Sequence, residues 1–300
     1  MPRFSRFAAG AAIVFTAALP LLADGPPLPL ALAIPDERAF LEEVRENLKS
    51  DQSLLEQYTF TERYTERRLD GRGGLKKSRN ETYEVYPSME PGKLYRRLIA
   101  RDGQRLSEKE LAEQDHKQEA KIEKRDRIRA EEDAAARARR LAKEEENRRK
   151  ERAVIDEVFR MDQIRIASRE VVDGRDTVVV TFTPRPGYEA VTKGGKVIQK
   201  LQGTAWIDAE DRQLVRLETR LIDTLGVGPA RVARLQRGAN GYFQRRKVNG
   251  EIWLPAFARF EGAARLLLVF GSRVEISSEY GDYRKFSVGT EEEIAPAPGD

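Results

Sequence analysis

The feature that most constrains this chain is a run of charged residues and alanines between Glu108 and Arg152. The run holds 14 acidic and 15 basic residues, so its charges nearly cancel, and its few large apolar residues are too sparse to build a core. Ala, Glu, Lys and Arg are strong helix formers, and opposite charges recur three and four residues apart. The run therefore predicts a solvated helical arm, roughly 65–70 Å long if it is continuous, at about 1.5 Å per residue.

Both ends of this arm carry recognisable signals. Ser107 and Glu110 fit a capping box, in which each side chain bonds to the backbone N–H of the other residue. Apolar residues return at helical spacing between Val154 and Met161, which predicts that the second end docks on the rest of the chain. The segment 107–161 is thus expected to be an inserted appendage, and a short Gly/Ser linker in place of its charged part should leave the body folded.

The rest of the chain alternates between apolar and polar residues with the period of two that is typical of β-strands. The expected strands are 58–65, 82–86 and 94–100 before the arm, and 164–172, 177–183, 201–208, 213–223, 241–248, 251–260, 266–270 and 274–286 after it. A helix is expected to precede them, because Asp36 can cap it and Phe40, Val44 and Leu48 recur at helical spacing. Asn249-Gly250 is a strong hairpin signal.

The order of these elements predicts one α+β domain. Because the connections are mostly short, neighbouring strands should pair antiparallel, and a sheet this large has to curl, split or close. The expected fold is a curled antiparallel β-sheet, an incompletely closed β-barrel, with the N-terminal helix inside the curve and the long charged helix inserted. The β-rich body should cover residues 34–288, and residues 289–300 should form a disordered tail.

The first 33 residues resemble an export signal. Its parts are the positive charges Arg3 and Arg6, the apolar residues 8–22 and the cleavage pattern Ala31-Leu32-Ala33. Cleavage would leave Ile34 as the first residue of a periplasmic protein. The alternative is a retained membrane anchor, but Pro20 and Asp24 shorten the apolar run below the roughly 20 residues that span a bilayer.

The composition excludes several classes of functional site but does not identify a function. The chain has no cysteine, which removes disulfides, thiolate metal sites and a cysteine nucleophile. Its net charge is only +4 and its basic residues are interleaved with carboxylates, so a nucleic-acid partner is not expected. His116 is the single histidine and lies in the charged arm, where a catalytic triad or a histidine metal site is a poor fit. We therefore expect a protein that is not an enzyme and that has no metal and no cofactor.

Four short stretches carry a resemblance to a known family. They are Tyr58 with Phe60 in the first strand, residues 203–208 leading to 213–216, residues 250–255, and residues 280–286. In this order they resemble the LolA/LolB-like periplasmic proteins that sort outer-membrane lipoproteins. The resemblance implies an incompletely closed antiparallel β-barrel lidded by helices, with an apolar cavity that accepts lipoprotein acyl chains. The charged arm departs from the simple carriers, and none of their functional residues can be matched here.

The aromatic residues suggest where acyl chains would bind, because they are spread over nearly every expected strand. They are either ordinary core or the lining of an apolar cavity. The cavity candidates are Phe60, Tyr83, Leu98, Val180, Trp206, Leu217 and Leu268. A one-residue error in register would turn any of them to the other face.

Two functions remain open at this point. One is a lipid- or lipoprotein-binding protein, peripheral rather than integral to the membrane, whose partners are acyl chains. The other is a cell-envelope interaction or sensory module of the same fold, with a self-filled cavity and the charged helix as binding element or spacer.

Overall fold

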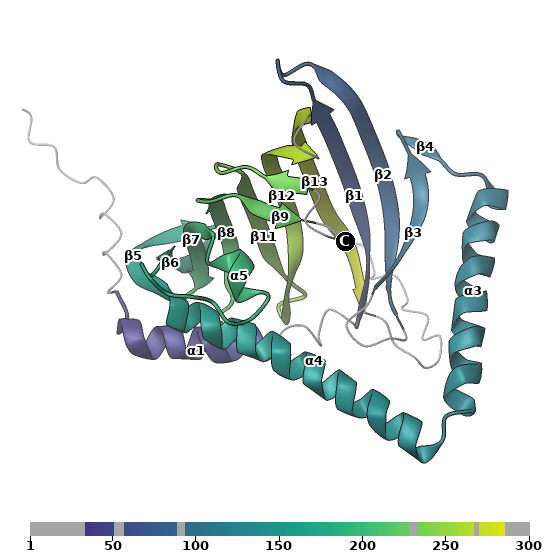
Figure 1. The fold of residues 1–300 in the computed structure, drawn as a ribbon, viewed down its shortest axis with the longest axis horizontal. Helices are drawn as coiled ribbons and strands as arrows, with labels where there is room; N and C mark the ends of the chain where they lie inside the picture. Colours follow the sequence, from purple (N-terminus) through teal and green to yellow (C-terminus); the bar gives the residue numbers. More distant parts are fainter. Residues whose placement is uncertain (1–33, 51–56, 89–93, 228–232, 267–269, 286–300) are drawn as a thin grey trace, which may run out of the picture. The chain divides into compact units, whose positions relative to one another are not determined.

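The computed structural model describes residues 34–50, 57–88, 94–227, 233–266 and 270–285. Four helices and thirteen strands lie in these ranges (Figure 1). The helices are α1 (Glu37–Ser50), α3 (Glu108–Ala130), α4 (Ala134–Met161) and α5 (Gly195–Ile198). The strands are β1 (Tyr58–Leu69), β2 (Leu75–Pro87), β3 (Leu94–Arg101), β4 (Gln104–Arg105), β5 (Asp162–Val172), β6 (Arg175–Pro184), β7 (Leu201–Asp208), β8 (Leu214–Leu221), β9 (Leu225–Val227), β10 (Ala233–Leu235), β11 (Asn240–Val248), β12 (Ile252–Leu266) and β13 (Phe270–Lys285).

The strands form one curled antiparallel sheet that hydrogen bonds do not close. Its order is β4-β3-β2-β1-β13-β12-β11-β8-β7-β6-β5, and β9 and β10 extend it beside β12. The predicted α+β class and the open, curled antiparallel sheet are confirmed. The Asn249-Gly250 hairpin is also present: both residues have positive φ, and Glu251 N donates to Val248 O at 3.0 Å.

The chain's first and last strands pair in the middle of the sheet, so its two open edges come from the middle of the sequence. β1 pairs with β13, whereas β5 forms one edge and β3, with the two-residue β4 along its end, forms the other. The charged arm, α3 and α4, is the connection between those two edges. It is therefore a strap that joins both sides of an open sheet, and not a loop inserted within one side.

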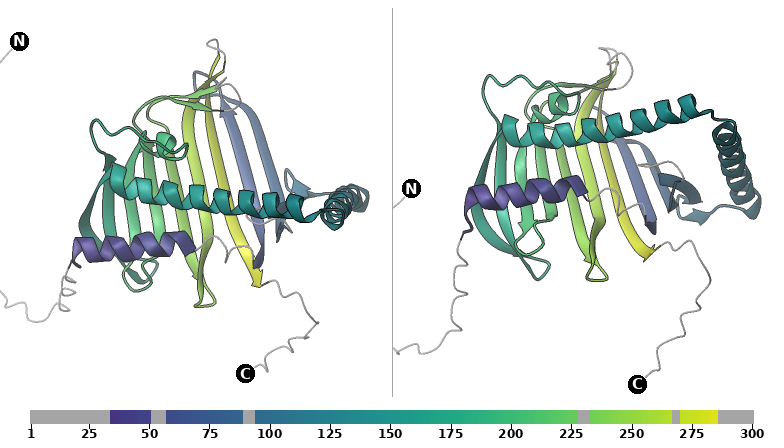
Figure 2. Two further views of the ribbon diagram at one scale, coloured as in Figure 1. Left: turned by 60° about the horizontal axis from the view of Figure 1, so that its bottom comes forward. Right: turned by 90° about the horizontal axis from the view of Figure 1, so that it is seen from below.

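The arm consists of two helices rather than one continuous helix. The predicted capping box at Ser107 and Glu110 is present at the start of α3. The break lies at Glu131–Asp133, where the Asp133 side chain caps α4 by accepting from Ala136 N at 2.6 Å. Asp favours such a cap over a helix interior because its carboxylate competes for backbone N–H groups. Figure 2 shows α1 and α4 on the same side of the sheet.

The two faces of the sheet can be followed from strand to strand, because directly paired residues point to the same side. We call the inner face the one that α1 covers, and the outer face the opposite one. One row of direct partners crosses the inner face: Val180, Ala205, Leu217, Phe243, Ala258, Ser278, Tyr64 and Glu81. This row is the reference for every placement below.

The ends of the arm are buried and its middle is exposed. Leu111 in α3 is buried, and Gln114 bonds to both backbone groups of Leu98 on the edge strand β3, at 2.9 and 3.0 Å. At the other end Glu157 and Met161 are fully buried, as the apolar pattern predicted for that segment. Most residues of α4 between 134 and 152 are exposed, so this stretch does not pack on the sheet. No helix among the described residues is long and apolar enough to cross a membrane.

Candidate functional site

The inner face divides into a covered half and an open half. The covered half comprises β5–β8, where Phe40 and Val44 of α1 pack against Val178, Val180 and Ile207. All five side chains are at most 4% exposed. The apolar stripe predicted for α1 therefore fills this half, and Asp36 fixes its start by accepting from Ala39 N at 2.8 Å.

The open half comprises the inner face of β11, β12, β13, β1, β2 and β3. Phe243, Phe260 and Ile276 lie on this face and remain partly exposed. Phe260 pairs directly with Ile276, so their side chains are neighbours. The middle of α4 is itself exposed, so it does not seal these residues from solvent. The open half is thus accessible at Phe243, Phe260 and Ile276, whereas Phe60 and Val85 on β1 and β2 are buried.

Towards β1–β3 the open half becomes a ladder of alternating tyrosine, arginine and glutamate. The Arg96 guanidinium lies 4.0 Å from the centroid of the Tyr83 ring and 5.8 Å from that of Tyr64. The Arg79 guanidinium also lies over the Tyr64 ring, 5.1 Å from its centroid. Arg96 Nε is 2.8 Å from a carboxylate oxygen of Glu62. Cations over aromatic faces and paired with carboxylates make this end of the face more polar than the part around Phe260 and Ile276.

Two buried carboxylates hold the ladder in place. Glu62 accepts from Ser278 Oγ at 2.8 Å, and Glu81 accepts from the Tyr83 hydroxyl. Both glutamates are less than 9% exposed. Burial, together with the hydrogen bond to Glu81, raises the pKa of Tyr83 to about 12. The Tyr83 hydroxyl therefore stays protonated and remains a donor at physiological pH.

The predicted cavity residues lie at several places. Phe60, Tyr83, Leu98, Val180 and Leu217 share the inner face by register. Val180 and Leu217 lie on strands of the covered half, and Phe60, Tyr83 and Leu98 lie on strands of the open half, where Phe60 is only 6% exposed. Leu268 lies outside the described residues. Whether these side chains bind a ligand stays a prediction.

Trp206 is separated from the other candidates because it points to the outer face. There it packs with Val179, Val215 and Trp253. Its Nε1 donates to a carboxylate oxygen of Glu170 at 2.8 Å. Trp206 thus belongs to a second core on the opposite side of the sheet from α1.

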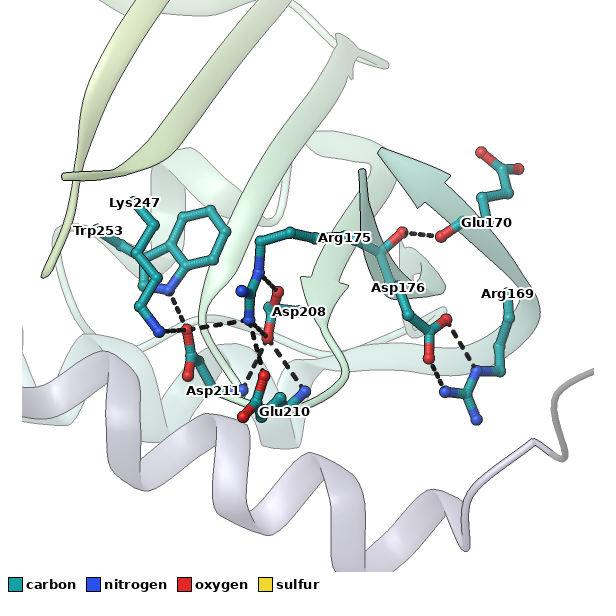
Figure 3. Close-up of polar contacts among 10 residues, drawn as sticks. Arg169, Glu170, Arg175, Asp176, Asp208, Glu210, Asp211, Lys247 and Trp253 are labelled. Atoms are coloured by element: carbon teal, nitrogen blue, oxygen red, sulfur yellow. Dashed lines mark hydrogen bonds and ion pairs between the residues drawn. The ribbon is translucent and has the colours of Figure 1, made fainter. Parts of the chain in front are cut away.

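A cluster of three carboxylates, Asp208, Glu210 and Asp211, lies beside Arg175 (Figure 3). Arg175 bonds to Asp208 and, through Nη2, to Glu210 at 3.2 Å. Lys247 Nζ lies 2.8 Å from Asp211 Oδ2, and Trp253 Nε1 donates to the same oxygen at 2.7 Å. A cation would have to compete with these partners.

The charges and hydrogen bonds of this cluster indicate a structural role. Burial raises the pKa of Asp208, but hydrogen bonds from Arg175 and from the backbone N–H groups of Asp211 and Glu210 outweigh that effect and lower it overall. Asp208 is 1% exposed and stays ionised beside its partners. The cluster therefore fixes the β7–β8 turn against β6 and β11. Its carboxylates already accept hydrogen bonds or ion pairs from Arg175, Lys247 and Trp253.

Sequence reasoning missed the ladder, although a signal for it is present. Residues 58–68 and 79–86 place Tyr, Glu and Arg at alternate positions, which looks like an ordinary half-exposed strand. Only the pairing of β1, β2 and β3 shows that these residues stack into one surface.

His116, the single histidine of the sequence, is exposed on α3.

No family model matches the chain, and no curated protein matches it in sequence. The solved structures to which it is similar include three proteins of low identity. A DUF1329 family protein from Desulfovibrio piger is 12% identical with a TM-score of 0.32, covering 85% of this chain and 95% of that chain. A putative outer membrane lipoprotein-sorting protein domain from Vibrio parahaemolyticus is 9% identical with a TM-score of 0.32, covering 86% and 96%. A LolA superfamily protein from Nitrosomonas europaea is 11% identical with a TM-score of 0.27, covering 88% and 99%.

The neighbours include lipoprotein-sorting and LolA superfamily proteins, as the sequence resemblance predicted. At these TM-scores the likeness says nothing about what this chain binds.

Proposed function

We propose that this chain is a non-enzymatic, periplasmic protein that shelters the acyl chains of a lipid or lipoprotein on the open half of its inner face. Transfer of acyl surface from water to this face would drive binding, at roughly 0.8 kcal/mol for each buried methylene. No covalent step and no cofactor is needed for this function.

One observation carries the proposal. In the covered half the inner-face residues Val178 and Val180 are buried under α1, whereas Phe243, Phe260 and Ile276 on the same face stay partly exposed. A protein rarely leaves a row of large apolar side chains accessible unless something covers it in use. An acyl chain is a suitable cover because it needs no specific polar partner.

The strap and the N-terminus agree with this proposal. The arm joins both open edges of the sheet, so it holds the curled sheet around its inner face while leaving that face unpacked. The export signal expected in residues 1–33 would bring the protein to the periplasm, where lipoproteins in transit need their acyl chains shielded from water.

The test uses two phenylalanines of the same strand that point to opposite faces. Phe260 pairs with Ile276 on the inner face, whereas Phe257 packs against Tyr242 on the outer face, with ring centroids 5.8 Å apart. Both are partly exposed. Phe260→Glu and Phe257→Glu therefore make the same chemical change three residues apart on opposite faces of β12.

The measurement is lipid extraction and mass spectrometry of the purified mature protein, followed by displacement of a fluorescent fatty acid. We expect wild type and Phe257→Glu to carry lipid and bind the probe, and Phe260→Glu to lose both. If wild type is free of lipid and does not bind the probe, the alternative is favoured, in which the chain is an envelope interaction module and the exposed arm is its binding element.

A further inference from the structure

A crevice of about 230 Å³ lies between the edge strand β3 and α3, next to the open half of the inner face. Its lining includes Tyr95 and Arg96 of β3 and Gln118, Lys121, Ile122 and Arg125 of α3. The partly buried stripe of α3 that starts at Leu111 faces this edge, so the crevice is formed where the arm leaves the sheet.

We propose that this crevice binds a head group with a net negative charge, whose phosphate or carboxylate is not balanced by a cation of its own, while the acyl chains lie on the open half of the inner face. This inference rests on the proposed function and adds to it the chemical class of the head group. Free phosphate has the same chemistry, and the experiment below separates the two sources.

The charge of the lining supports an anion. Three cations line the crevice, Arg96, Lys121 and Arg125, and no carboxylate of the described residues lines it. The carboxylates that pair with two of them, Glu62 and Asp126, lie outside the lining. The surplus of positive charge along this lining favours a phosphate or carboxylate there, with Lys121 as the cation that has no ion pair among the described residues.

Tyr95 adds an unused donor. Its hydroxyl is buried and has no hydrogen-bond partner in the described part of the chain. Burial, and then the nearby charge of Asp115, raises the pKa of Tyr95, so the hydroxyl stays protonated. Tyr95 pairs with Tyr86 whereas Arg96 pairs with Val85, so this donor borders the crevice from the face of β3 opposite to Arg96.

Arg96 joins the crevice to the acyl surface. Its guanidinium lies 4.0 Å from the Tyr83 ring centroid on the open half, and the same residue lines the crevice. A molecule with apolar chains and an anionic end can therefore contact the aromatic ladder and the crevice together. This arrangement orients the ligand, with its head group at the β3 edge.

The experiment compares two short-chain lipids that differ in head group. Calorimetric titration of the full mature chain with dihexanoyl-phosphatidylglycerol and dihexanoyl-phosphatidylcholine measures the preference for an anionic head. The variant is Lys121→Glu, on an exposed position of α3 in the lining. The control is Lys109→Glu, which makes the same charge change on the same helix outside the lining.

We expect wild type and Lys109→Glu to bind phosphatidylglycerol about tenfold more tightly than phosphatidylcholine. Lys121→Glu should lose this preference and keep its affinity for phosphatidylcholine. Equal binding of both lipids by wild type, or a preference that survives in Lys121→Glu, overturns the inference and leaves the proposed function standing. If neither lipid binds to wild type, the proposed function fails as well.

Competition by inorganic phosphate identifies the source. Displacement of phosphatidylglycerol by phosphate alone shows that the crevice also takes free phosphate. Absence of displacement, with the Lys121 dependence intact, shows that the head group is held only together with its acyl chains. Both results support an anion site.

Discussion

The covered and open halves of the inner face have the same alternating strand sequence, but their inner side chains differ in exposure. In β6 and β7 the inner residues Val178, Val180 and Ile207 are buried because α1 lies on them. In β12 and β13 the inner residues Phe260 and Ile276 stay partly exposed because no described helix packs there. Alternation along a strand therefore identifies a face but does not say what covers it. The difference is set by α1, which is too short to reach beyond one half of the sheet.

The arm gives the strongest test of this division, because it joins the edges of both halves. We expect replacement of residues 108–153 by about six Gly/Ser residues to abolish cooperative unfolding. Such a linker reaches roughly 20 Å when fully extended, whereas the part of α4 that it replaces, residues 134–153, alone spans about 30 Å. Thermal melting followed by circular dichroism measures the effect.

A linker of about thirty residues is the matched control. It is long enough to join the edges without strain, and it should restore cooperative melting with a lower helical signal. A short-linker variant that melts like wild type would show that the edges can approach each other, and that the arm is the simple appendage that the sequence predicted.

The second prediction compares one phenylalanine from each half. Phe40→Ala removes a side chain that is 3% exposed in the covered half, and it should lower the free energy of unfolding by about 3–5 kcal/mol. Phe243→Ala in the open half should cost less, about 1–2 kcal/mol, because that side chain is only partly buried. Urea denaturation of both variants measures the difference, and similar losses would mean that the open half is packed in solution.

Much of the fold could be predicted from local patterns. The capping box at Ser107, the Asn249-Gly250 hairpin and the strand alternation each depend on residues close in sequence, and all three are present. The pairing of β1 with β13 depends on residues more than two hundred positions apart, and no local pattern encodes it. For the same reason the sequence did not reveal that the arm joins the two edges.

The candidate site was less predictable than the fold. Trp206 was expected on the same face as Val180, but Trp206 pairs with Val179 and therefore points outward. The residues 180 and 206 belong to different strands, so their relative face depends on a register that alternation cannot fix. The head-group crevice includes residues of α3, whose position beside β3 follows from tertiary contacts and not from its nearly uniform charge pattern.

The third prediction concerns Asp162, the C-cap residue of α4 and the first residue of β5, beside the covered half. Its side chain is 1% exposed, and neither carboxylate oxygen has a hydrogen-bond partner among the described residues. Burial raises the pKa of Asp162 to about 6, and the charge of Arg185 only partly opposes this. Because the folded state holds the proton more tightly than the unfolded state, stability should fall as pH rises from about 4 to about 6.

Asp162→Asn should remove this pH dependence and raise the free energy of unfolding at pH 7 by on the order of 1–2 kcal/mol. Denaturation curves at several pH values measure it. Asp126→Asn, on the exposed part of the arm, is the control and should change neither quantity. An unchanged pH profile in Asp162→Asn would show that the carboxylate has partners in solution.

The smallest expected effect separates the two ends of the arm. At the covered half Glu157 is fully buried and accepts hydrogen bonds from the backbone of Val191 and Thr192. At the open half α3 starts with the exposed capping box, in which Glu110 N donates to Ser107 Oγ at 3.3 Å. Ser107→Ala removes one side of that box and should cost about 0.5–1 kcal/mol, mostly as local fraying.

Amide hydrogen exchange, measured for each peptide, shows which segments lose protection. In Ser107→Ala we expect faster exchange in the first turns of α3 and no change around Glu157, because the two ends are held by separate contacts. Ser107→Asp is the control and should restore protection, since Asp is an equally good cap. Faster exchange at both ends would mean that the arm opens as one unit. In that case the arm would leave both edges of the sheet together, and its two ends would not be held independently.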